Sequence, residues 1–235
     1  MKNTNCELCT NTNCFVKMYC SPEWIQKISS SKYQIYFKQN QKIISEGEPV
    51  LGVFFIQKGK VKVISTGFDG KQQIVRFAND GHILGHRGLG DERYPISAVA
   101  MDNSFICFVL NDTLNNMFMA NPKFSTGLMM FYSQELRKIE TRIKNLAQMN
   151  LREKVVETLL LMVQMFGLNE ENELNVPFTR EDIASSVGTN VEQVSRQLSE
   201  FEEEGFIMKH GRKIAIINSD GFKNIISKYF MQYFE

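Results

Sequence analysis

Residues 178–205 constrain the fold of this chain most, because their pattern predicts two short helices joined by a tight turn. Thr179 and Asp182 form a Ser/Thr-x-x-acid start signal, and Thr189 and Glu192 form a second one. Gly188 lies between them, where a helix commonly ends in a left-handed residue. Each helix also carries an apolar stripe that predicts packing on a core. The stripes are Ile183 and Val187 in the first helix, and Val191, Val194, Leu198 and Phe201 in the second.

The predicted second helix leaves a short polar face on its outer side, at spacings of i, i+3, i+4 and i+7. This face consists of Glu192, Ser195, Arg196 and Ser199. A polar face beside a tight helical turn is the arrangement that the major groove of DNA accepts. The alternative is an ordinary two-helix core fragment with a solvated polar face, because turn-linked amphipathic helices are common.

A basic hairpin after the second helix favours the DNA-binding interpretation. Residues 206–217 predict a strand, a turn at Gly211 and a second strand. Lys209, His210, Arg212 and Lys213 gather at the tip, where the wing of a winged helix would meet phosphate. A solvated hairpin turn is the alternative for this cluster.

Length and composition fit a regulatory protein without identifying one. The 235 residues, 43% of them hydrophobic, suffice for one large or two modest domains. The net charge is +1, and residues 150–235 carry 9 lysines and arginines against 14 aspartates and glutamates. This balance disfavours non-specific binding to nucleic acid, which depends on Lys and Arg. Neither a membrane-length apolar stretch nor a secretory signal pattern occurs, so we expect a cytoplasmic protein without membrane contact.

Cysteine usage is uneven along the chain. Cys6, Cys9, Cys14 and Cys20 lie in the first 20 residues, whereas Cys107 stands alone in an apolar run. Clustered cysteines in a cytosolic chain suggest a metal or redox centre, and thiolates suit zinc or an iron–sulfur cluster. The C-x2-C-x4-C spacing supplies three thiols, so a fourth must come from Cys20 or Cys107. A structural zinc knot and free thiols on a disordered tail are the alternatives.

Two further patterns lie between the cysteines and the predicted DNA-binding segment. Short β-type runs at residues 53–56, 61–64 and 73–77, with turn signals at Gly59 and Gly70, predict a β-roll or small barrel. After Pro122 a long helical pattern carries an apolar heptad seam. We expect this seam to be a two-helix dimer interface; the alternative is a long helix packed on its own domain. The seam consists of Met129, Tyr132, Leu136, Ile139, Ile143 and Leu146.

The order of β-roll, long helix and winged helix resembles the CRP/FNR family of bacterial transcription regulators over essentially the whole chain. The implied fold class is α+β, with a β-roll like that of cyclic-nucleotide-binding domains, a long dimerisation helix and a C-terminal winged helix-turn-helix. We expect a cysteine-rich arm at residues 1–20, the β-roll sensor domain at 21–121, the dimerisation helix at 122–150 and the DNA-binding domain at 151–235.

The strongest resemblance lies in the predicted reading helix. Residues 191–196, Val-Glu-Gln-Val-Ser-Arg, look like the V-E-x-x-S-R of FNR-type members, which read half-sites close to TTGAT. The resemblance implies that Glu192 accepts from cytosine, Ser195 contacts a thymine and Arg196 binds guanine, and the chemistry of these pairs agrees. Glu192 has a competing role as the capping partner of Thr189. The remaining residues expected to contact DNA are Thr179, Arg180, Lys209 and Arg212, and RNA polymerase is a candidate partner.

The resemblance argues against a cyclic nucleotide as the effector. Receptors of that kind use a Gly-Glu-Leu turn for the ribose and an Arg-Ser or Arg-Thr pair for the phosphate. Here the turn reads Gly85-His86-Arg87, and Ile96 takes the place of the phosphate-binding Arg. A buried cyclic phosphate would lack its counter-charge, which is costly. Arg93 could supply it only with a rearranged loop.

The oxygen-sensing FNR branch carries a [4Fe-4S] cluster on three N-terminal cysteines and one β-roll cysteine. The resemblance therefore implies Cys6, Cys9, Cys14 and Cys107 as ligands, with Cys20 spare. The gap before Cys14 is one residue shorter than in the enteric pattern, so zinc, a thiol-redox sensor or no centre stay open. In FNR an Asp on the seam keeps the cluster-free protein monomeric. Ile139 at that position should instead hold the dimer together without a cluster.

The implied function is a homodimeric regulator that senses oxygen, nitric oxide or redox state; a regulator with another effector, or none, is the alternative. A cupin-like metalloenzyme would need about three histidines and a carboxylate in the barrel. The chain has only His82, His86 and His210, without an H-x-H pair, and it has no nucleophile elbow or phosphate loop. We therefore expect no enzyme. We interpret His82 and His86 as polar turn residues, with His86 as a haem ligand the alternative.

Overall fold

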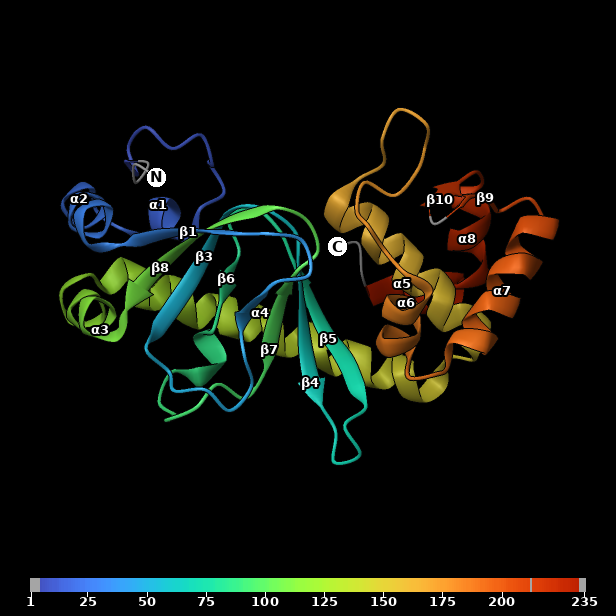
Figure 1. The fold of residues 1–235 in the computed structure, drawn as a ribbon, viewed down its shortest axis with the longest axis horizontal. Coiled ribbons are helices and arrows are strands. Elements are labelled where there is room, and N and C mark those ends of the chain that lie inside the picture. Colours follow the sequence, from blue (N-terminus) through green and yellow to red (C-terminus); the bar gives the residue numbers. More distant parts are fainter. Residues whose placement is uncertain (1–4, 212, 233–235) are drawn as a thin grey trace. The chain divides into compact units, whose positions relative to one another are not determined.

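The computed structural model describes residues 5–211 and 213–232, and the chain divides into two compact units, residues 1–136 and 137–235 (Figure 1). The first unit contains two four-stranded antiparallel sheets, with strand orders β1-β8-β3-β6 and β2-β7-β4-β5. The strands are β1 (Tyr33–Phe37), β2 (Lys42–Ile44), β3 (Gly52–Lys58), β4 (Val61–Thr66), β5 (Gln72–Ala78), β6 (Ile83–Leu84), β7 (Ser97–Ala100) and β8 (Ser104–Leu110). The helices that begin in this unit are α1 (Phe15–Tyr19), α2 (Pro22–Ser31), the 3-10 turn η1 (His86–Gly88), α3 (Asn111–Ala120) and α4 (Pro122–Gln148).

The central strand of the first sheet is apolar on both faces. β3 pairs with β8 on one side and β6 on the other, and its residues from Gly52 to Ile56 are buried. The turn after β3 depends on Gly59, which has φ 146°. A Cβ at Gly59 would lie 2.1 Å from Ser104 Oγ, so a larger residue would disrupt both the turn and the packing. The turn predicted at Gly59 is therefore confirmed, together with its physical reason.

The N-terminal segment is part of the core of the first unit. Phe15 and Val16 of α1 and Ile28 of α2 are buried in one cluster with Phe55 of β3 and Phe124 of α4. The ring of Phe15 meets that of Phe124 edge to face at 5.5 Å. This packing fixes the cysteine-bearing residues against the first sheet.

The β-type pattern begins later along the chain than the sequence predicts. The β-type pattern was expected from Ser21, but residues 22–31 form α2. Ser21 caps this helix by accepting from the backbone N–H of Trp24 at 3.4 Å, and Pro22 occupies its first turn. Because Trp24 and Ile28 lie one turn apart, they bury the same face of α2. The first strand begins only at Tyr33.

The second unit is a winged helix-turn-helix. Its core includes the rings of Phe201, Phe206 and Phe222, and the last two stack with centroids 5.3 Å apart. Asn150 and Glu153 form a capping box at the start of the unit's first complete helix. The elements are α5 (Leu151–Phe166), α6 (Arg180–Val187), α7 (Val191–Glu203), β9 (Ile207–His210), β10 (Lys213–Ile216), α8 (Ser219–Ile225) and the 3-10 turn η2 (Ser227–Gln232).

The predicted α+β class and its order of β-roll, long helix and winged helix-turn-helix are confirmed. The long helix, α4, has 27 residues and begins at Pro122 as expected. Within the described residues, no helix is both long and apolar enough to span a bilayer.

Candidate functional site

Local interactions fix both ends of α6, the first helix of the helix-turn-helix. Thr179 Oγ1 accepts from the backbone N–H of Asp182 at 3.1 Å, and Asp182 Oδ2 accepts from the backbone N–H of Thr179 at 3.0 Å. Gly188 ends α6 in the left-handed region, with φ 74° and ψ 42°. The predicted capping box and the turn glycine are both confirmed. The hydroxyl of Thr179 also donates to Asp182 Oδ2 at 2.8 Å. The side chain of Thr179, which we predicted to contact DNA, is thus already used in the helix cap.

The predicted start of the second helix is wrong by one residue. The cap of α7 is Asn190, whose Oδ1 accepts from the backbone N–H of Gln193 at 2.9 Å. Asn is among the strongest N-cap residues, and its side chain satisfies one of the N–H groups that the first turn of a helix leaves without an intrahelical acceptor. The hydroxyl of Thr189 instead bonds the side chain of Gln193. Glu192 therefore has no capping role that would compete with DNA.

The outer face of α7 carries the side chains predicted to read DNA. Glu192 and Arg196 are exposed, and neither has an ion-pair partner within the part of the chain that the structure describes. Ser195 and Ser199 are half-buried at the edge of this face. Val194, Leu198 and Phe201 are buried on the opposite side as predicted. Val191 is the exception, because it is exposed at the first turn and does not complete the stripe.

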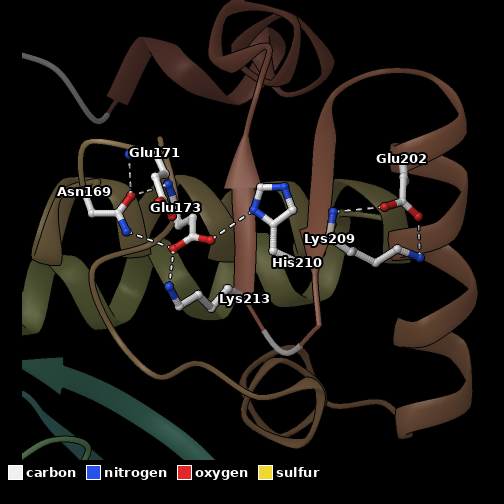
Figure 2. A network of polar contacts seen from close by, with 7 residues as sticks. All are labelled: Asn169, Glu171, Glu173, Glu202, Lys209, His210 and Lys213. Carbon is white, nitrogen blue, oxygen red and sulfur yellow. Dashed lines mark hydrogen bonds and ion pairs between the residues drawn. The ribbon is translucent and has the colours of Figure 1, made fainter.

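The wing is braced by acidic side chains (Figure 2). Glu173 is only 2% exposed and accepts from Lys213 Nζ at 2.6 Å and from Asn169 Nδ2 at 2.9 Å. Its other oxygen lies 3.0 Å from Nδ1 of His210. Lys209 pairs with Glu202 of α7 at 2.7 Å and also donates to Ser199 at 3.2 Å. Three of the four residues predicted at the tip, Lys209, His210 and Lys213, thus have protein partners, a feature that sequence reasoning missed.

The other residues predicted to contact DNA, Arg180, Lys209 and Arg212, differ from one another in their surroundings. Arg180 is exposed at the first turn of α6, whereas Arg212 lies outside the described residues. Lys209 would have to exchange Glu202 for phosphate to contact DNA, so its first role is to tie the wing to α7. Phosphate binding by these residues stays a prediction.

Four of the five cysteines line one pocket in the first unit. Cys6, Cys9 and Cys14 come from the N-terminal segment, and Cys107 comes from β8. Cys20 does not line this pocket; it is 5% exposed, and its Sγ lies 3.4 Å from Sδ of Met117. All five are free thiols. The structure thus brings together the four cysteines predicted as ligands and places the fifth elsewhere.

Side-chain N–H groups donate to two of these sulfurs. Lys32 Nζ donates to Cys107 Sγ at 3.5 Å, and Gln57 Nε2 donates to Cys9 Sγ at 3.7 Å. Burial raises the pKa of the Cys107 thiol to about 11, although Lys32 acts in the opposite direction. Burial also raises the pKa of Cys14. In the metal-free protein these two thiols are therefore protonated at neutral pH, and metal binding would release their protons.

The donor set of this pocket fits an iron–sulfur cluster. Four thiols with N–H donors at the sulfurs are the usual surroundings of a [4Fe-4S] centre, in which each thiolate binds a different iron. Among the described residues, no three His, Cys, Asp or Glu side chains are arranged to hold a single metal ion. A cluster accepts wider spacing between thiols than one ion does, because its ligands bind separate irons.

The region that would hold a cyclic phosphate in a nucleotide receptor carries an engaged cation. Arg93 Nη1 donates to the backbone carbonyl of Gly47 at 2.6 Å, and Ile96 is buried. Ser97 Oγ accepts from the backbone N–H of Glu46 at 3.0 Å. That the protein binds no cyclic nucleotide stays a prediction. The prediction assumes that a cyclic phosphate would lack a counter-charge here, and the positions of Arg93 and Ile96 agree with this assumption.

His86 lies in a turn, as we interpreted it, but this turn residue is buried. His86 is 3% exposed, and its ring meets those of Phe131 and Tyr132 edge to face. Burial, together with the charges of Arg76 and Arg87, lowers the pKa of His86 to about 3, so the imidazole is neutral. The apolar residues before Gly85 were the sequence signal for this burial. Tyr132, predicted in the seam, donates its hydroxyl to the carbonyl of His86 at 2.5 Å.

The predicted seam is otherwise an exposed apolar stripe on α4. Met129 is 73% exposed and Ile143 is 62% exposed, and Leu136 and Ile139 are exposed as well. Leu146 is half-buried. Large apolar side chains in a continuous row are more often an interface than a solvated surface.

Comparison with known proteins identifies both units. Residues 34–121 match the family described as cyclic nucleotide-binding domain, and residues 153–225 match the Crp-like helix-turn-helix domain. The transcriptional activator protein FnrA of Stutzerimonas stutzeri is 24% identical over 186 residues, covering 78% of this chain and 76% of that protein. The fumarate and nitrate reduction regulatory protein of Salmonella typhimurium is 25% identical over 185 residues, covering 78% and 74%.

Solved structures share the fold. FixK2 from Bradyrhizobium japonicum gives a TM-score of 0.72 at 24% identity, covering 82% of this chain and 96% of that chain. The c-di-GMP responsive global regulator CLP of Xanthomonas campestris gives a TM-score of 0.74 at 15% identity, covering 83% and 99%. At these identities the likeness to the solved structures establishes the architecture alone.

The wing brace predicts a pH-dependent contribution to stability. The hydrogen bond from Lys213, followed by that from Asn169, lowers the pKa of Glu173 from 4.5 to about 2. Stabilisation by a carboxylate with a lowered pKa is complete above its unfolded pKa and is lost as the pH falls through its folded pKa. We expect Glu173→Gln to lower the Tm at neutral pH, and the difference from the parent to shrink between about pH 5 and pH 2.

Glu171→Gln is the matched control, because Glu171 is exposed on the same loop. Thermal unfolding of the three proteins over a pH series checks the prediction. A Tm difference for Glu173→Gln that is absent at neutral pH, or that grows in acid, would show that the carboxylate charge does not brace the wing.

Proposed function

This chain belongs to the CRP/FNR family of DNA-binding transcription regulators, and we propose that it acts as an FNR-like member that senses oxygen, nitric oxide or redox state. In this proposal a homodimer binds an inverted repeat of TTGAT-like half-sites. Cys6, Cys9, Cys14 and Cys107 hold one [4Fe-4S] cluster that reports the signal.

The observation that carries the proposal is the common pocket of those four cysteines. Three are close in sequence, but Cys107 comes from β8, far away along the chain. A structural zinc knot confined to the N-terminal segment would not need Cys107. The names of two relatives point the same way: the Salmonella protein is a fumarate and nitrate reduction regulator, and a protein of Aggregatibacter actinomycetemcomitans is called anaerobic regulatory protein. The latter is 24% identical over 216 residues, 88% of this chain.

The chain's own residues supply binding and orientation at the cluster. When bound, the cluster supplies one-electron chemistry and reactivity toward oxidants. Cys107 anchors it to β8, and the three N-terminal thiols anchor it to a segment that packs against the same sheet. Lys32 and Gln57 direct N–H groups at the ligand sulfurs, which stabilises charge there. Loss of the cluster would remove one of the links between these two parts, while the packing of α1 and the hydrogen bonds of Asn11 would stay.

The exposed face of α7 supports sequence-specific DNA binding. The free guanidinium of Arg196 can donate to both O6 and N7 of guanine, and the carboxylate of Glu192 can accept from the cytosine amino group. The caps at Thr179 and Asn190 fix where α6 and α7 begin, so they orient this face. Few cations lie nearby, hence affinity should depend on these base contacts more than on general charge.

We expect Arg196→Ala to weaken binding to a TTGAT inverted repeat by about 1–3 kcal/mol and to relax the choice of base at the guanine. Lys223→Ala removes one positive charge from α8 in the same unit and is the control. Fluorescence anisotropy with the parent and guanine-substituted duplexes gives both quantities. Equal affinity and selectivity in Arg196→Ala and the parent would contradict the assignment.

We expect the dimer to persist without a cluster, because Ile139 and its seam neighbours bury apolar surface worth roughly 1.5–3 kcal/mol per large side chain. Ile139→Asp should place like charges in the interface and shift the protein toward monomer. Gln134→Asp adds the same charge at an exposed position outside the seam. Sedimentation of the metal-free proteins at micromolar concentration measures the outcome. A monomeric metal-free parent would overturn the prediction.

The cluster itself is tested by paired cysteine variants. As a ligand, Cys107 is needed for cluster assembly, so Cys107→Ala should abolish the visible absorbance and the bound iron and sulfide. Cys20→Ala should keep them, because Cys20 contacts Met117 outside the pocket. Both variants and the parent would be reconstituted anaerobically, and their absorbance, iron and sulfide would be measured. Circular dichroism would confirm that each variant is folded. A parent that takes up zinc but no iron and sulfide contradicts the sensor; loss in Cys20→Ala with retention in Cys107→Ala contradicts the ligand set.

A further inference from the structure

A buried lysine lies at the thiol pocket. Lys32 follows the last residue of α2, is only 3% exposed and lines the same pocket as the four cysteines. Its ammonium donates to Sγ of Cys107 at 3.5 Å. Cys6 is a second neighbour of this ammonium, so the charge faces thiols from both segments that form the pocket.

An ammonium in such a position is costly unless negative charge lies close to it. A [4Fe-4S] core bound to four thiolates carries a net negative charge, and that charge would lie against the Lys32 ammonium. Because this ammonium already donates to Cys107, it would stabilise negative charge on that ligand of the proposed cluster.

Two other lysines, Lys17 at this pocket and Lys27 on α2, have different partners. Lys17 also lines it, but its ammonium donates to the backbone carbonyl of Cys9 at 2.8 Å. Lys27, on the same helix α2, is exposed and pairs with Glu23 at 2.7 Å. Lys32, by contrast, donates to the sulfur of a proposed ligand.

We propose that Lys32 is a positioning residue for the cluster, whose ammonium binds the Cys107 thiolate and raises the cluster's reduction potential. The inference rests on the proposed function. In the step concerned, a one-electron reductant, such as the reduced mediator of a redox titration, would give one electron to the iron core, while no bond breaks and all four thiolates stay bound. A neighbouring positive charge and an N–H···S hydrogen bond both stabilise the more negative, reduced form. The residue would thereby set how readily the sensor loses an electron.

The test compares midpoint potentials of reconstituted proteins. Lys32→Met removes the charge and the donor while keeping a side chain of similar length, Lys32→Gln keeps a neutral donor, and Lys32→Arg keeps the charge. Lys27→Met is the matched control on α2. We expect Lys32→Met to shift the one-electron equilibrium about tenfold toward the oxidised form, a fall of about 59 mV. Lys32→Arg should recover most of the shift, Lys32→Gln less of it, and Lys27→Met should behave as the parent.

An anaerobic mediated redox titration, followed by electron paramagnetic resonance of the reduced cluster, supplies the potentials. A folded Lys32→Met protein that binds less iron and sulfide than Lys32→Arg would also support the role, because the charge then stabilises the assembled cluster. Unchanged potential and cluster content in Lys32→Met and Lys32→Gln would overturn the inference and leave the proposed function intact. A parent without iron and sulfide would overturn both.

Discussion

The packing of the N-terminal segment against the first sheet is the constraint on which the proposed sensor depends. Cys107 is fixed on β8, so the other three thiols can reach it only if the segment before α1 is held in place. Asn11 supplies part of that hold, because its amide donates to the carbonyls of Ile56 and Gln57 on β3. The backbone N–H of Phe15 bonds the carbonyl of Gly81. These contacts order a segment that cysteine spacing alone would leave free.

The same packing links the pocket to the start of the long helix. Phe15 contacts Phe124 and Phe131 of α4, and a Cβ at Gly127 would lie 2.3 Å from the ring of Tyr19. One core therefore contains proposed ligand residues, α1 and the first half of α4. Because such a core is closely packed, a displacement of the cysteine-bearing segment would displace side chains of α4 as well. A buried ion pair between Arg76 of β5 and Glu135 of α4, at 2.8 Å, adds a second link between the roll and this helix.

Much of the helix-turn-helix and the wing could be predicted from the sequence, because the residues that fix their turns and caps are neighbours along the chain. The capping box at Thr179, the left-handed Gly188 and the wing turn at Gly211 depend on neighbouring residues, and each was predictable. The cap at Asn190 was missed because two adjacent residues, Thr189 and Asn190, are both good caps and only geometry chooses between them. The burial of His86 and the pairing of Lys209, His210 and Lys213 with glutamates are tertiary effects. Glu202 and Glu173 come from a helix and a loop whose approach to the wing no local pattern encodes.

In the proposed function the state of the thiol pocket controls DNA binding, and one measurement tests this control most directly. Affinity for a duplex with a TTGAT inverted repeat would be measured on a single anaerobic preparation, before and during stepwise exposure to oxygen, alongside its iron and sulfide content. The account predicts that affinity changes in proportion to the cluster lost and is regained on anaerobic reconstitution. Affinity that stays constant while the cluster disappears would contradict it.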